Sequence, residues 1–146
     1  MGLPDSELRT RIAISFQSQP AHHEKTPMSI VSLNDLLARA MREGYALGYF
    51  EAWDPYSLEA VLEAAEETRS PAILGFGGAV ANPFWLDRWG VEELAALARS
   101  LAEHATVPTT VFFNEARTFA QVLRGLRAGC NAVMLDTSHL PYAENL

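Results

Sequence analysis

Short apolar runs alternate with segments of helical periodicity along most of this chain, and this alternation constrains the fold most. From Ile30 onward a helical segment comes first, and three further helical segments then separate four apolar runs. The runs are Tyr45–Phe50, Ala72–Leu74, Thr109–Phe113 and Ala132–Leu135. Continuously apolar strands between amphipathic helices are typical of a parallel sheet buried on both faces. The pattern predicts an α/β fold and fits both a doubly wound sheet and a (β/α)8 barrel.

Helix start and stop signals flank the periodic segments. Asp54 and Pro55 supply an N-cap followed by proline at the first helical position, and Thr118 with Gln121 has the spacing of a capping box. Gly44 stands where a C-terminal glycine ends a helix. Apolar residues recur at helical spacing in each segment: Leu36, Leu37, Ala40 and Met41; Leu58, Val61, Leu62 and Ala65; Val91, Leu94, Ala95, Ala98 and Leu101; Phe119, Val122, Leu123 and Leu126.

The composition excludes several classes of protein. With 49% hydrophobic residues in 146, the chain is too apolar for intrinsic disorder. Eighteen acidic against eleven basic residues, a net charge of −7, argue against a nucleic-acid or anionic-membrane partner. No apolar run approaches the roughly 20 residues of a membrane span, and the N-terminus lacks a signal-peptide core. The single cysteine, Cys130, excludes an internal disulfide, and we expect it to be a packing residue in a cytoplasmic protein.

The first 27 residues differ from the rest of the chain. They contain three prolines, polar stretches and one short apolar patch. The adjacent His22 and His23 have no cysteine nearby and one acidic neighbour, Glu24, which indicates a solvated loop more than a metal site. We therefore interpret 1–27 as a flexible leader or a mis-called start ahead of Met28, and 28–146 as the folded part.

Polar residues follow the predicted strands, where α/β proteins bind their ligands. Glu51, Glu115 and Asp136 each come directly after or close to the end of a strand, so we expect three carboxylates at one rim. Carboxylates gathered in one place require a cation, a proton or a basic residue. An all-oxygen set favours Mg²⁺ or Mn²⁺ over Zn²⁺, and His139 would make a mixed site. The candidate residues at the strand ends are Glu51, Gly75, Gly77, Gly78, Asn114, Glu115, Asp136, Thr137, Ser138 and His139.

Structural roles are the alternative for several of these candidates. Asp54 is better explained as a helix cap than as a ligand. For Glu115 a solvated loop position, and for His139 a turn before Pro141, are explanations as good as a role in a site. Asp136 directly ends a buried strand, where an unpaired charge is costly, and this favours a role in a site.

Glycines follow the second predicted strand. Gly75, Gly77 and Gly78 are expected to open a long loop through Trp85, where backbone amides can approach a phosphate or carboxylate. No basic residue lies within this motif, and Arg88 is the first that follows it. The first strand is followed by acidic and aromatic residues in place of Gly-x-Gly-x-x-Gly, and there is no P-loop, so both nucleotide-binding motifs are excluded.

Several motifs between residues 28 and 146 follow the pattern of one known family: Met28–Ser32, Gly44–Ala46, Leu62–Glu66, Ser70–Leu74, Ala128–Gly129 and Val133–Pro141. On these residues the segment resembles the N-terminal half of the class II, metal-dependent ketose-bisphosphate aldolases, which act on fructose and tagatose bisphosphates. The resemblance implies a (β/α)8 barrel, a zinc cofactor and a phosphorylated sugar or related carbonyl substrate. It also implies aldehyde-lyase chemistry in carbohydrate metabolism such as glycolysis.

The chain departs from this family at the motif that performs proton transfer. The family has His-x-Asp-His at the end of its third strand, where the aspartate transfers the proton and the last histidine binds zinc. Phe112–Glu115 stand there in this chain, so Asn114 occupies the aspartate position and Glu115 the zinc-ligand position. An amide cannot exchange a proton at neutral pH, whereas a carboxylate can still bind a metal. Asp136 matches a family position near the metal, and Glu51 replaces a typical asparagine.

The length of the chain is its second departure from the family. A (β/α)8 barrel needs about 250 residues, and the family's other zinc ligands and its Gly/Ser phosphate loops come from later strands. Four parallel strands leave two edges and one face of the sheet uncovered. We expect a truncated product, two associating half-barrels (a homo-oligomer), or a second half on another polypeptide.

These observations leave three alternative functions. The first is a metal-dependent aldolase with impaired cleavage, because Asn114 replaces the catalytic aspartate. The second is an Mg²⁺- or Mn²⁺-dependent lyase or isomerase that uses Glu51, Glu115 and Asp136, with Glu51 or Glu115 as the base. The third is a non-catalytic fragment or degenerate paralogue that folds by association.

Overall fold

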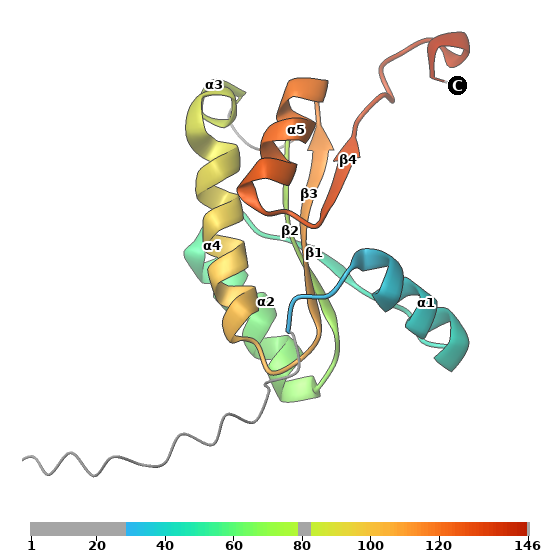
Figure 1. Ribbon diagram of the computed structural model, residues 1–146, viewed down its shortest axis with the longest axis vertical. Helices are drawn as coiled ribbons and strands as arrows, with labels where there is room; N and C mark the ends of the chain where they lie inside the picture. Colours follow the sequence, from blue (N-terminus) through green and yellow to red (C-terminus); the bar gives the residue numbers. More distant parts are fainter. Residues whose placement is uncertain (1–28, 79–82, 146) are drawn as a thin grey trace, which may run out of the picture.

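Four parallel strands form one sheet whose order follows the chain (Figure 1). The computed structural model describes residues 29–78 and 83–145, so the expectations for residues 1–27 and for Met28 lie outside the described part. Every neighbouring pair of strands is parallel. The strands are β1 (Tyr49–Glu51), β2 (Ala72–Gly77), β3 (Thr109–Ala116) and β4 (Ala132–Leu135). The α/β prediction is therefore confirmed.

The crossover helices lie on one face of this sheet. Figure 1 shows α2 (Pro55–Thr68), α4 (Val91–His104) and α5 (Phe119–Ala128) together on that face, and α1 (Leu33–Glu43) on the other side. A doubly wound sheet would carry crossover helices on both faces and reverse its strand order. Sequential order with one helical face belongs instead to a (β/α)8-type barrel, of which the described chain forms four strands. No helix in the described ranges is long and apolar enough to cross a membrane.

The predicted helix caps explain where the helices begin and end. Ser32 precedes α1 and its hydroxyl accepts a hydrogen bond from the Asp35 amide (3.1 Å), while Gly44 ends the helix in the left-handed region (φ 71°). At the start of α2, Asp54 and Ser57 satisfy each other's backbone amides in a capping box. These local hydrogen bonds fix the path of the chain into and out of β1.

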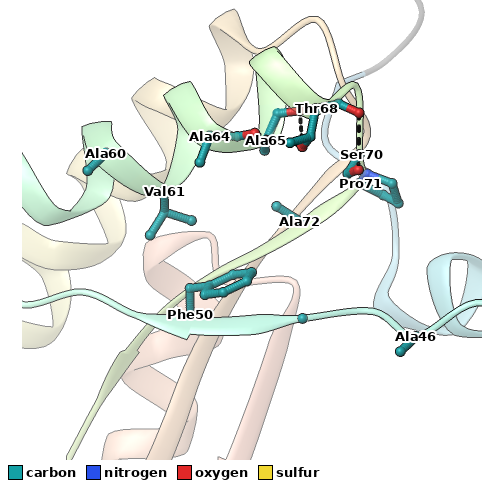
Figure 2. Close-up of a pocket in the computed structure, with 11 residues that line it drawn as sticks. Ala46, Phe50, Ala60, Val61, Ala64, Ala65, Thr68, Ser70, Pro71 and Ala72 are labelled. Atoms are coloured by element: carbon teal, nitrogen blue, oxygen red, sulfur yellow. Dashed lines mark hydrogen bonds between the residues drawn. The ribbon is translucent and has the colours of Figure 1, made fainter.

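The first strand is shorter than predicted. We expected Tyr45–Phe50, but pairing begins only at Tyr49, opposite Ile73. The neighbouring strand β2 starts at Ala72, directly after Pro71, which has no backbone N–H to donate. The residues before Tyr49 therefore lack a strand to pair with. Some of them line a groove of about 540 Å³ between β1 and α2 instead (Figure 2).

The second and third strands are longer than predicted. Gly75 and Gly77 lie inside β2, opposite Phe112 and Asn114, and do not open a loop as expected. β3 continues past Phe113 to Ala116. Residues Pro83–Trp85 form the short helix α3, and a π-helical turn η1 (Leu86–Gly90) leads into α4 where a loop was expected. The fully buried side chain of Leu86 anchors this turn to the core, which explains its regular structure.

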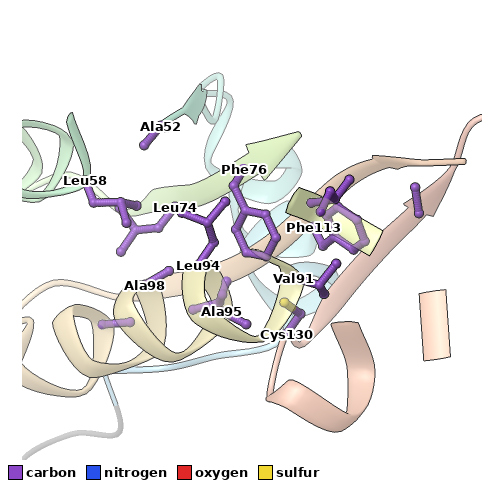
Figure 3. Packing of buried hydrophobic residues seen from close by; sticks show 14 residues of the cluster. Ala52, Leu58, Leu74, Phe76, Val91, Leu94, Ala95, Ala98, Phe113 and Cys130 are labelled. Atoms are coloured by element: carbon purple, nitrogen blue, oxygen red, sulfur yellow. The ribbon is translucent and has the colours of Figure 1, made fainter. Parts of the chain in front are cut away.

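The core lies between β2, β3 and α4 (Figure 3). Phe76 and Phe113 stack with ring centroids 5.0 Å apart, and the fully buried Ala95 and Ala98 of α4 belong to the same cluster. Cys130 is buried in the same cluster, and burial raises the pKa of its thiol to about 12. The cysteine is therefore a packing residue, as expected, and not a ready nucleophile.

The predicted capping box at α5 is only half correct. Thr118 accepts a hydrogen bond from the Gln121 amide (3.2 Å), but the Gln121 side chain does not return to the Thr118 amide. Its Oε1 accepts from the Arg117 amide (2.8 Å) and its Nε2 donates to Asp87 Oδ1 (2.5 Å). Gln121 is buried at 3% exposure, so one side chain joins α5 to the π-helical turn across 34 residues of sequence.

Replacing Gln121 with alanine should lower the free energy of unfolding by about 2 kcal/mol, because two buried hydrogen bonds are lost. Urea unfolding followed by circular dichroism measures this. The control Arg127→Gln changes an exposed residue of the same helix and should stay within about 0.5 kcal/mol of wild type. Equal effects of the two substitutions would contradict the role assigned to Gln121.

Candidate functional site

The side of the sheet opposite the crossover helices carries the candidate site; we call it the inner face. Side chains alternate between the two faces of a strand. Leu74, Phe76, Val111 and Phe113 pack into the helix-covered core. The residues between and beside them therefore belong to the inner face: Tyr49, Glu51, Gly75, Gly77, Phe112 and Asn114.

The two inner-face glycines of β2 leave room for side chains from β1. A Cβ atom on Gly75 would lie 2.0 Å from Cε2 of Tyr49, and one on Gly77 would lie 2.4 Å from Oε1 of Glu51. The Tyr49 ring thus crosses β2 and meets Phe112 of β3 edge to face, with centroids 5.4 Å apart and planes at 76°. Side chains of β1 and β3 make contact over β2 because β2 has none at these positions.

Tyr49 and Glu51 form a polar contact at the end of the inner face. The Tyr49 hydroxyl donates to Glu51 Oε2 (3.0 Å). Burial raises the pKa of Tyr49, the negative charge of Glu51 and its hydrogen bond raise it further, and the nearby Asn114 side chain lowers it. Tyr49 is therefore a neutral hydrogen-bond donor at physiological pH, which joins Glu51 and Asn114 in one cluster.

Sequence reasoning missed Tyr49. It was assigned to a buried strand on its hydrophobic neighbourhood alone. Its position two residues before Glu51 was the available signal, because residues i and i+2 of a strand share a face.

Asn114 and Glu115 lie at the C-terminal end of β3, as the sequence predicted for a strand-end pair. Asn114 is in register with Gly77, and its backbone oxygen accepts from the Gly78 amide (2.9 Å). Glu115 adopts the left-handed region (φ 53°), which is unusual for a residue with a side chain. The β3–β4 register shifts between Phe113 and Ala116, so Glu115 sits at a bulge, a feature common beside functional sites.

Gly78 packs against this bulge. A Cβ atom there would lie 2.3 Å from the backbone oxygen of Glu115. Gly77 and Gly78 thus have packing roles that explain glycine at both positions. The prediction that their amides approach a phosphate remains a prediction.

Asp136 is held in a turn of its own. Its amide donates to the Ala116 oxygen (2.8 Å), and its Oδ1 accepts from the Ser138 amide (2.9 Å). The Ser138 side chain and amide lower the pKa of Asp136, with a smaller contribution from the charge of His139. Ser138 and His139 are exposed. The carboxylate is satisfied by its neighbours in sequence. The sequence favoured a role in a site for Asp136 and allowed a turn only for His139, so the site role of Asp136 stays a prediction.

The resemblance implies a metal ion, which needs several donor side chains close together. Zinc, magnesium and manganese each need three or more protein or substrate ligands in one place. Within residues 29–78 and 83–145, no three histidine, cysteine, aspartate or glutamate side chains come close enough to hold a metal. The described residues do not fit a metal by themselves. Ligation by Glu115 and Asp136 stays a prediction.

Comparison with known proteins gives consistent results. Residues 31–146 match the family model described as class-II fructose-bisphosphate aldolase. The chain is 32% identical over 121 residues to a probable fructose-bisphosphate aldolase of Bacillus subtilis (strain 168), covering 82% of this chain and 41% of that one. It is 34% identical over 119 residues to the D-tagatose-1,6-bisphosphate aldolase subunit GatY of Klebsiella oxytoca, covering 82% and 40%.

A solved structure has the same arrangement of strands and helices. The crystal structure of the YdjI aldolase from Escherichia coli K12 superposes with a TM-score of 0.69 at 27% identity, over 80% of this chain and 43% of that one. This chain therefore spans about two fifths of the length of the relatives that it matches.

Gly78→Ala should destabilise the fold by about 1–3 kcal/mol, because the new methyl group meets a backbone oxygen that cannot rotate away. Gly77→Ala is the matched control. Its methyl group meets the end of the Glu51 side chain, which can move, so the cost should stay below about 1 kcal/mol. Thermal and urea unfolding measure both; a larger loss for Gly77→Ala would refute the packing account.

Asp136 should titrate below the ordinary aspartate range, and Ser138→Ala should raise its pKa toward that range. NMR titration of the carboxyl carbon measures this, with Ser70→Ala as the control. A lowered folded-state pKa stabilises the folded chain at neutral pH, and this contribution is lost as pH falls through that pKa. An unshifted Asp136, or one insensitive to Ser138→Ala, would contradict the turn geometry.

Proposed function

The chain belongs to the class-II fructose-bisphosphate aldolase family, and from that membership we propose that its rim of strand ends binds a phosphorylated sugar or related carbonyl compound without ordinary aldol cleavage. The rim consists of the C-terminal ends of β1–β4, where proteins of this architecture bind ligands. The observation that carries the proposal is Asn114, at the end of β3 where the family resemblance implies a proton-transferring aspartate.

The environment of Asn114 supports binding more than proton transfer. An amide donates and accepts hydrogen bonds but does not take up a proton at neutral pH. Tyr49 beside it is kept neutral by burial and by Glu51. A substrate hydroxyl or carbonyl at this position would meet an amide and a phenol, which orient it without ionising.

Glu51 supports a second candidate, a lyase or isomerase that uses a carboxylate base. The hydrogen bond from Tyr49 fixes one oxygen of Glu51 near Asn114. In such a reaction Glu51 would remove a proton from carbon beside the substrate carbonyl and later return it. Glu115, at its bulge, is the alternative base.

A divalent metal would require ligands beyond those described. We propose that Glu115, at the family's histidine position, and Asp136 are the residues that this part of the chain contributes. Zinc is the metal implied by the family, and Mg²⁺ or Mn²⁺ suits the oxygen donors. When bound, such an ion polarises a substrate carbonyl.

We expect dihydroxyacetone phosphate and fructose 1,6-bisphosphate to bind, and fructose 1,6-bisphosphate to remain uncleaved. Chemical shifts of the Asn114 side-chain amide report binding, and a coupled assay for triose phosphate release reports cleavage. Asn114→Ala should weaken binding about tenfold through the loss of a hydrogen bond to the ligand. Arg127→Gln, on the exposed face of α5, is the control and should leave binding unchanged.

Two results would overturn the proposal. Robust wild-type cleavage that EDTA abolishes would show that Asn114 does not impair the aldolase reaction. The absence of shifts at the rim with millimolar ligand, in a folded sample, would exclude the binding function.

A further inference from the structure

The two oxygens of the Glu51 carboxylate have different surroundings. Oε2 accepts the hydrogen bond from the Tyr49 hydroxyl (3.0 Å). Oε1 is the atom closest to the position that a Cβ atom on Gly77 would take, at 2.4 Å, and Oε2 is 2.8 Å from the same position. The carboxylate therefore lies across β2, and Oε1 is the oxygen that Tyr49 does not engage. Such an oxygen keeps lone pairs that can accept from a ligand or take up a proton.

The side chain of Asn114 lies beside this carboxylate. Gly77, which the carboxylate covers, is in register with Asn114 of β3. Since neighbouring strands are about 4.8 Å apart, the carboxylate and the Asn114 amide are neighbours on the inner face. Tyr49 is close to both, because its hydroxyl donates to Glu51 and the Asn114 side chain influences its pKa. A carboxylate and an amide donor thus stand next to each other at the rim.

Packing of the ring determines where the Tyr49 hydroxyl lies. Cε2 of the ring is 2.0 Å from the position of a Cβ atom on Gly75, and the ring meets Phe112 edge to face. Tyr49 is half-buried, and as residues i and i+2 of β1 it and Glu51 share the inner face. The hydroxyl is therefore held at Oε2 by contacts of the ring with β2 and β3.

A general base acts only within hydrogen-bond reach of the proton that it removes, so its orientation matters as much as its chemistry. A glutamate side chain has three rotatable bonds, and the hydrogen bond from Tyr49 restricts them. A misplacement of about 1 Å can cost about a hundredfold in rate. A group that fixes one carboxylate oxygen therefore aims the other.

We propose that Tyr49 is a positioning residue, whose hydroxyl holds Oε2 of Glu51 so that Oε1 faces the carbon beside a bound carbonyl group. The role rests on the proposed lyase or isomerase chemistry, in which Glu51 removes a proton. It adds the residue that aims the carboxylate and the oxygen that reacts. The ligand class is a phosphorylated ketone or ketose with hydrogen on the carbon beside its carbonyl.

The step that this geometry supports is enolisation. The bond between that carbon and its hydrogen breaks, and the proton forms an O–H bond with Oε1 of Glu51. The electron pair left behind forms a carbon–carbon double bond, and the carbonyl π pair moves to the oxygen, to which the Asn114 amide donates a hydrogen bond. Return of a proton from Oε1 to the same carbon restores the ligand. In D₂O the carboxyl group exchanges with the solvent, so deuterium returns instead.

Deuterium exchange into dihydroxyacetone phosphate tests the role. The hydroxymethyl proton signal, followed by NMR in D₂O, should disappear faster with the 146-residue chain than without it, and Glu51→Gln should reduce the rate to that background. Tyr49→Phe keeps the ring over Gly75 and removes only the hydrogen bond, so kcat for exchange should fall about tenfold while KM changes less than about twofold. Tyr56→Phe is the matched control, because Tyr56 is a tyrosine on α2 that is 81% exposed, and it should exchange at the wild-type rate.

A second variant displaces the same carboxylate without changing Tyr49. Gly77→Ala places a methyl group where Oε1 lies, so it should also lower kcat about tenfold. Because both substitutions act through one carboxylate, Tyr49→Phe/Gly77→Ala should lose much less than the hundredfold of two independent effects. A merely structural role for Tyr49 would make the two losses multiply. Circular dichroism establishes that each variant is folded.

Full exchange by Tyr49→Phe, or multiplied losses in the double variant, would overturn the positioning role. Exchange that survives Glu51→Gln but is lost in Glu115→Gln would overturn it as well, because the base would then be Glu115. A folded wild-type chain that binds dihydroxyacetone phosphate, with shifts at the Asn114 amide, and exchanges none of its protons would overturn the role and leave the proposed binding intact. The absence of both binding and exchange would overturn both.

Discussion

The close approach of side chains over Gly75 and Gly77 determines how the inner face is arranged. Neither position leaves space for a Cβ atom, since the Tyr49 ring and the Glu51 carboxylate occupy it. Because β2 has no side chains at these two positions, the Tyr49 ring contacts the Phe112 ring and the Tyr49 hydroxyl donates a hydrogen bond to Glu51. The cluster around Asn114 and the contact of Tyr49 with Phe112 both follow from this one constraint. A side chain at position 75 would separate the Tyr49 ring from Phe112.

The same rim carries the residues on which the proposed function depends. Asn114 and Glu115 lie at the end of β3, at a bulge that places Glu115 in the left-handed region. Gly78 packs against the backbone of that bulge. The rim thus has a defined geometry around Asn114, the amide that the family resemblance implies in place of a proton-transferring aspartate. The proposal of binding or altered chemistry over ordinary cleavage rests on that resemblance.

Most elements of the fold were predictable from local signals. The caps at Ser32 and Asp54 and the glycine at Gly44 act within a few residues, so the sequence alone locates those helix ends. Strand ends were less predictable, because pairing depends on a neighbour far along the chain. β1 begins late since β2 starts after Pro71, and β2 extends through glycines that resemble a loop in sequence. Gln121 likewise bonds to Asp87, a partner that no local rule identifies.

The sequence by itself determined the α/β class, the family and the identity of the residues at the strand ends. Those properties depend on periodicity, on short motifs and on residue chemistry, all of which are local. Periodicity left a doubly wound sheet and a barrel open, the family resemblance favoured the barrel, and the strand order confirms it. Only the tertiary structure joined Tyr49 to Glu51 and Asn114, and separated Asp136 into its own turn. These outcomes depend on which strands are neighbours and on how much space each side chain leaves. That information exists only once distant segments pack together.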